Sequence, residues 1–192
     1  LSDGLLAKFS RELADRYGET RVVAELYGVE QLYRILGEGE TRGDIVVDVV
    51  ASSGAPIPCL AVGSQGSEFD TYLAALPATL LADAYERFGT RLLELNVRAF
   101  LGVRGRKSVN AGLRRTIINE PQHFLAYNNG IVATVDDIET VFLPDGGHAI
   151  TRLAGLQIVN GGQTTASIHR ARRQDGAKLD GILVPSKIIR VG

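Results

Sequence analysis

The chain has 192 residues, of which 45% are hydrophobic and 22% are charged, and its formal net charge is −1 at pH 7. This is the composition of a globular protein with a buried core, and no apolar run approaches the roughly 18 residues that a membrane span needs. The single cysteine, Cys59, excludes an internal disulfide framework, and together with the lack of a signal peptide it predicts a cytoplasmic protein with no membrane partner.

The first 66 residues are predicted to form a small α/β unit. The pattern favours a capped amphipathic helix at 2–17, a strand at 21–27 and a short helix at 29–36. Residues 44–50 are β-branched and alternate in polarity, and residues 58–62 are an apolar run, so two further strands are predicted there.

Residues 69–95 are predicted to be helical, because apolar residues such as Leu73, Leu76 and Leu80 recur at steps of three and four. Pro77 is expected in the first turn of a second helix, and Gly89 is expected to interrupt that helix. Residues 109–118 are predicted to form another helix, which ends before Pro121.

The remaining sequence mixes strands with one long helix. Strands are predicted at 131–135, 139–143, 149–153, 156–159 and 182–191, with a turn at 145–147 and a helix at 163–173. The whole pattern predicts an α/β or mixed α+β fold with a central mixed sheet and flanking helices, and it does not determine the strand order. Residues 67–192 are expected to form the main domain.

The strongest local motif leads from a β-branched strand through Asn-Gly-Gly into a helix. It consists of Asn160, Gly161, Gly162, Gln163, Thr164 and Thr165. Adjacent glycines permit positive φ and a close approach of the backbone to a ligand, and the first N–H groups of a helix attract anions. The motif is therefore a candidate cradle for a phosphate or carboxylate. A tight turn whose threonines cap the helix is an equally weighted alternative, and the motif is not a Walker P-loop.

Two other segments carry polar residues suited to binding. Asn128 and Asn129 precede Gly130, a pattern that favours a turn, although two carboxamides also suit the edge of a base or a sugar. Arg98 lies in a basic segment with two glycines and is a candidate cation for a phosphate. The other basic residues of that segment are interpreted as solvated surface.

The sequence lacks the usual signatures of a hydrolase. His123, His148, His169 and Cys59 are scattered without metal-ligand spacing, and no Gly-x-Ser-x-Gly motif occurs. An acidic residue followed by Glu-x-Lys or Asp-x-Lys, as a restriction-type nuclease would need, is also missing. No metal site is therefore predicted, the cofactor stays unknown, and the question of catalysis is left open.

Charge is divided unevenly along the chain. Residues 1–95 hold 8 Lys and Arg against 15 Asp and Glu, a net charge of −7, whereas residues 96–192 hold 13 against 7, a net charge of +6. The second half could face an anionic partner such as a nucleotide or nucleic acid. With equal weight, the two halves could instead pair with each other.

Five collinear blocks resemble the AIPR family, whose name stands for abortive infection phage resistance. They are residues 91–101, 109–113, 121–124, 127–131 and 157–165, with weaker similarity at 73–89 and 184–191. The resemblance implies a prokaryotic intracellular protein that is associated with abortive infection and often encoded beside restriction–modification genes. It also implies members longer than this chain. The missing methionine and the start at Leu1 agree with a fragment.

Three hypotheses about function follow. The first is a defence module that binds a phosphate-bearing ligand, nucleotide or nucleic acid, at residues 160–165, with Asn128 and Asn129 alongside and Arg98 supplying charge. The second is part of a nuclease or nucleotidase whose catalytic acids lie outside the chain. The third is a structural or partner-docking domain. A weaker similarity to the Asp-Gly-Gln motif of DGQHR and ParB-type domains favours binding over hydrolysis, because Asn160 stands in place of the acid.

Overall fold

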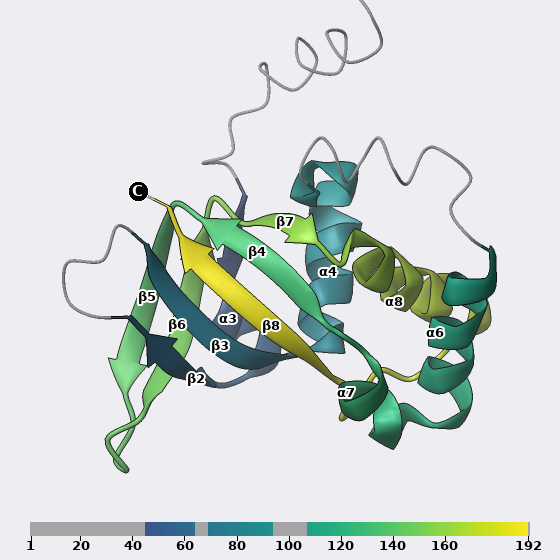
Figure 1. Ribbon diagram of the computed structural model, residues 1–192, viewed down its shortest axis with the longest axis horizontal. Coiled ribbons are helices and arrows are strands. Elements are labelled where there is room, and N and C mark those ends of the chain that lie inside the picture. Colours follow the sequence, from purple (N-terminus) through teal and green to yellow (C-terminus); the bar gives the residue numbers. More distant parts are fainter. Residues whose placement is uncertain (1–44, 64–68, 94–106, 192) are drawn as a thin grey trace, which may run out of the picture. The chain divides into compact units, whose positions relative to one another are not determined.

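The computed structural model describes residues 45–63, 69–93 and 107–191, all within the unit that runs from Glu40 to Gly192. The elements predicted at 2–17, 21–27 and 29–36 lie outside the described residues, and so does Arg98. The described part is a mixed sheet with helices packed against it, which confirms the predicted architecture (Figure 1). None of its helices is long and apolar enough to cross a membrane.

Eight strands and seven helical segments make up this part of the chain. The strands are β1 (Val46–Asp48), β2 (Ile57–Val62), β3 (Asp70–Pro77), β4 (Ile131–Val135), β5 (Asp137–Phe142), β6 (His148–Ala154), β7 (Gln157–Asn160) and β8 (Leu183–Arg190). The helices are α3 (Val49–Ser53), α4 (Ala78–Phe88), α6 (Lys107–Asn119), α7 (Phe124–Tyr127) and α8 (Gly162–Asp175), with the short 3₁₀ helices η2 (Gly89–Leu92) and η3 (Pro121–His123).

The sheet has the order β1-β6-β2-β3-β8-β4-β7, and β5 pairs with β6 off this path. β1 and β2 pair with successive parts of β6, so strands from both sides of residue 66 join one sheet. Among the described strands, only β4 and β8 run parallel. The last strand, β8, thereby lies between β3 and β4 in the middle of the sheet (Figure 1).

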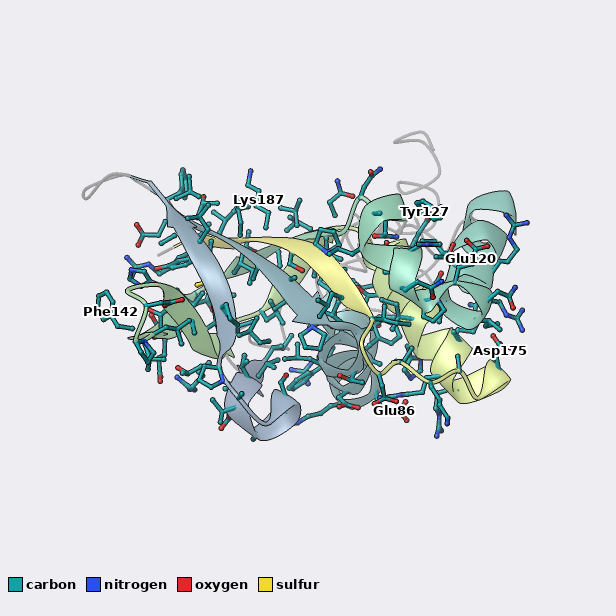
Figure 2. The ribbon with its side chains drawn as sticks, turned by 90° about the horizontal axis from the view of Figure 1, so that it is seen from below. Glu86, Glu120, Tyr127, Phe142, Asp175 and Lys187 are labelled. Carbon is teal, nitrogen blue, oxygen red and sulfur yellow. The ribbon has the colours of Figure 1, made fainter. Side chains whose placement is uncertain are left out.

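Helices cover one face of this sheet. The core lies between the helices and the sheet: Leu80 and Leu81 of α4 are fully buried, and so are Ala133 of β4 and Ile188 of β8. Helix α8 packs between α4 and α6. The other face, called the open face below, presents Leu60, Leu73, Val132 and Lys187 and is bordered by α7. Figure 2 shows Lys187 on the side of the sheet away from Glu86 of α4.

The prediction of a helix for residues 69–76 is wrong, because these residues belong to β3. This strand pairs with β8 along its whole length and with β2 along half of it. A helix would place Leu73 and Leu76 on one face, whereas their odd separation in a strand places them on opposite faces. Leu76 is fully buried and Leu73 is 44% exposed. Ladders on both sides of the strand satisfy its backbone, and this outweighs the local spacing.

Pro77 and Asp48 mark two further differences. Pro77 is the N-cap of α4 instead of lying in its first turn. The strand predicted at 44–50 ends at Asp48, because the carboxylate of Asp48 accepts a hydrogen bond from the Ala51 amide at 2.9 Å and so begins α3. The other predicted elements within the described residues are confirmed to within two residues at each end. Gly89 ends α4 as expected.

Candidate functional site

The two polar segments singled out from the sequence meet in space. β7 pairs with β4, and this register places Asn160 opposite Val132. A Cβ atom added to Gly161 would lie 2.5 Å from the Gly130 carbonyl oxygen and 2.9 Å from the Ile131 Cα atom. Residues 128–130 and 160–165 are therefore in contact, and together they are called the loop pair below.

Glycine is required at both contact positions of the loop pair. Gly161 has a φ of +82° and Gly130 has a φ of +77°, a backbone conformation that L side chains rarely adopt. A Cβ atom on Gly130 would overlap the Pro185 carbonyl group of β8. The glycines thus let the backbones of β4, β8 and the start of α8 approach each other closely.

Two asparagines of the loop pair use their side-chain oxygens within their own loops, and the third is exposed. The Asn128 side-chain oxygen accepts a hydrogen bond from the Gly130 amide at 2.6 Å, which confirms the predicted turn. The Asn160 side-chain oxygen accepts from the Gly161 amide at 2.7 Å. Both residues keep the donors of their NH₂ group for a ligand. Asn129, which is exposed, contributes its side chain at the edge of the open face.

The start of α8 has no side-chain cap, so the alternative in which threonines cap this helix is not what the structure shows. The Thr165 amide donates to the Gly161 carbonyl oxygen at 3.2 Å, and the amides of residues 162–164 precede the first intrahelical bond. The side chains behind them are buried: Thr164 is 7% exposed and Thr165 is 0% exposed. The Thr165 hydroxyl has no hydrogen-bond partner within the described part of the chain.

Burial divides the six predicted site residues at positions 160–165 into two groups. Gly162, Thr164 and Thr165 are buried and shape the start of α8 from inside. Asn160 is exposed, and Gly161 and Gln163 are half-buried, so these three can contact a ligand. The accessible part of the predicted cradle is consequently smaller than the six-residue motif suggested.

A groove of about 630 Å³ opens on the open face beside the loop pair. Its walls include the apolar side chains of Leu60, Leu73 and Leu125. Asn129 adds a carboxamide to the lining, and Lys187 adds a positive charge. Sequence analysis did not single out Lys187, because only the pairing of β8 with β3 and β4 reveals which face it occupies. Burial raises the pKa of the Cys59 thiol in the groove wall, so this thiol is not an activated nucleophile.

Ion pairs between the two halves of the chain support the second interpretation of the uneven charge. In helix α8, Arg172 lies 2.6 Å from Asp83 of α4, and Arg173 lies 3.6 Å from Glu86 of α4. Arg190 of β8 lies 2.6 Å from Asp70 of β3. Each of these arginines therefore lies beside a carboxylate from the first half of the chain.

Glu86 also receives a hydrogen bond from His169 at 2.5 Å. This bond, followed by the positive charge of Arg173, lowers the pKa of the Glu86 carboxyl group. On the far side of α8, Arg114 of α6 donates to the Asp175 carboxylate. The charged surface of α8 is therefore used to join three helices.

The described residues contain no group of three or more His, Cys, Asp or Glu side chains that could hold a metal ion. The arrangement at the loop pair offers hydrogen-bond donors from the backbone at the start of α8 and from carboxamide side chains. Its chemistry suits the binding of an anion.

A protein-family model matches part of the chain. The model described as "AIPR protein" matches residues 93–192, which is just over half of the chain. The matched range contains both parts of the loop pair and Lys187. No curated protein and no solved structure matches the chain.

Proposed function

Since the chain belongs to the AIPR family, we propose that it acts in phage defence by binding a phosphate-bearing ligand, a nucleotide or a nucleic acid, at the loop pair. The family supplies the context of abortive infection and phage resistance. The ligand is inferred from the chemistry of the loop pair.

The observation that carries this proposal is the uncapped start of α8 beside exposed carboxamides. Free N–H groups and the helix dipole, equivalent to roughly half a positive charge, favour an anion at this end. Asn129, Asn160 and Gln163 add uncharged donors from the two contacting segments of the loop pair. Asn160 carries no negative charge, so it does not repel a phosphate as a carboxylate at that position would.

Thermal-shift measurements with a panel of nucleotides and short oligonucleotides test this proposal. We expect a ligand to raise the melting temperature of the wild-type chain and to raise that of Gln163→Ala much less. Gln174→Ala is the matched control, because Gln174 is exposed at the other end of the same helix. If no compound shifts the wild-type melting temperature, ligand binding at the loop pair is wrong.

A structural role for the loop pair is the second candidate. It is favoured by the bonds that Asn128 and Asn160 make to their own loops and by the burial of Thr165. In that case Gln163→Ala and Asn128→Ala would reduce protection in a phage-challenge assay only in proportion to their loss of stability. Loss of protection by Gln163→Ala at unchanged stability would instead favour a ligand.

A further inference from the structure

Lys187 lies in a row of side chains that crosses four strands of the open face. The register pairs Leu60 with Leu73, Leu73 with Lys187, and Lys187 with Val132. Residues that face each other in register point to the same side of a sheet. The row therefore sets one ammonium group among aliphatic side chains.

The row ends at Val132, where β4 has an irregular register between Val132 and Ala133 and meets the loop pair. Val132 is paired with Asn160 on its other side, so the backbones at Lys187 and Asn160 are two strand spacings, or about 10 Å, apart. Asn129 of the loop pair also lines the groove that contains Lys187. Asn129 thus belongs to both the loop pair and the groove.

The groove has the character of a site for a small amphiphilic anion. Its volume of about 630 Å³ is in the usual range for small-molecule sites, which are mostly apolar with a few polar groups. Leu60, Leu73 and Leu125 are 62%, 44% and 45% exposed, so they offer apolar surface that a ligand can cover. Among the described residues that line the groove, none is acidic and Lys187 is the one cation.

Lys187 also differs from four arginines of the fold. Arg114, Arg152, Arg172 and Arg190 each meet a carboxylate, whereas Lys187 has no ion-pair partner within the described ranges. A cation set between Leu73 and Val132 fits a ligand that brings one anionic group together with an apolar body.

We propose that the groove is the second half of the ligand site and that the ligand is a mononucleotide. Its base and sugar lie against Leu60, Leu73 and Leu125, and its phosphate lies between Lys187 and the donors of the loop pair. This inference rests on the proposed function and narrows it from any phosphate-bearing ligand to a small one.

The lining argues against a nucleic-acid strand in this groove. Single strands are held by several cations along the backbone and by aromatic side chains on which bases stack. Here the described part of the lining has one cation and no aromatic residue. Tyr127, the exposed aromatic residue next to the loop pair, packs instead against His123, with ring centroids 5.3 Å apart.

Isothermal titration calorimetry of the full chain tests this proposal. The probes are the ribonucleoside monophosphates and triphosphates, the corresponding nucleosides, inorganic phosphate and a ten-residue oligodeoxythymidylate. We expect Lys187→Gln to weaken nucleotide binding at least about tenfold, because a charge-assisted contact is lost, and to leave nucleoside binding unchanged. Leu73→Ser should weaken both. Lys178→Gln, at an exposed lysine away from the groove, should weaken neither.

The outcomes separate this inference from the proposed function. The inference is overturned if mononucleotides do not bind but the oligonucleotide does, or if Gln163→Ala weakens nucleotide binding while Lys187→Gln and Leu73→Ser do not. In either case binding at the loop pair survives. If none of the phosphate-bearing probes binds the wild-type chain, both proposals are wrong. Lys187 and Leu73 are exposed, so we expect both variants to fold. Melting temperatures without ligand that equal the wild-type value will confirm this.

Discussion

Replacing Gly161 with alanine tests whether the loop pair is held together by close packing. The added Cβ atom would lie 2.5 Å from the Gly130 carbonyl oxygen and 2.9 Å from the Ile131 Cγ2 atom. The left-handed conformation costs alanine about 1–2 kcal/mol. Displacing backbone and a branched side chain in a packed region costs about 1–3 kcal/mol more. We therefore expect Gly161→Ala to lower the free energy of unfolding by about 2–5 kcal/mol.

Gly176 provides the matched control at the other end of α8. It is also left-handed, with a φ of +64°, but a Cβ atom there would meet nothing within 4 Å. Gly176→Ala should lose only the conformational part, about 1–2 kcal/mol. Urea unfolding of both variants isolates the packing contribution as their difference. If Gly161→Ala is no more destabilising than Gly176→Ala, the two loops are not in close contact and the reasoning is refuted.

Three further predictions concern the fold around the site. Leu76→Ala should lower the free energy of unfolding by about 2–5 kcal/mol, because Leu76 is fully buried, whereas Leu73→Ala on the open face should lower it by well under half as much. Equal losses in urea unfolding would contradict the strand at Asp70–Pro77. Gly130→Ala should give little folded protein, because its Cβ atom overlaps the Pro185 carbonyl group; a soluble yield and melting temperature equal to those of wild type would show that the contact is absent. The pKa of Glu86 is lowered in the folded state by His169, so its contribution to stability is present above the ordinary carboxyl pKa of 4.5 and is lost as pH falls through the lower folded value. The difference in unfolding midpoint between wild type and Glu86→Gln should therefore shrink between pH 6 and pH 3, and a difference independent of pH would argue against this pair.

Elements whose local pattern agreed with their long-range contacts could be predicted from the sequence. Ile131–Val135 alternates between buried and half-buried residues along its whole length, as its sequence indicates. Residues 70–77 could not be assigned in the same way, because Leu73 and Leu76 have helical spacing and only the ladders with β2 and β8 make them a strand. Local spacing carries no information about such partners.

Only part of the candidate site could be predicted, because a local pattern does not show which distant segments meet. Both segments of the loop pair stood out by composition, since glycines and carboxamides indicate turns and close approach. Their contact depends on the pairing of β4 with β7, which no local pattern specifies. The burial of Thr164 and the exposure of Lys187 likewise follow from tertiary packing, and the role of Arg98 stays a prediction outside the described residues.

The most direct test of ligand binding at the loop pair is an NMR titration that follows backbone amides. A nucleotide that binds as proposed should produce its largest chemical-shift changes at Asn129 and at residues 161–164, with smaller ones at Lys187. Gln163→Ala should reduce these changes, and Gln174→Ala should not. Saturable changes confined to other parts of the chain, or none at all, would contradict the assignment of the loop pair as the ligand site.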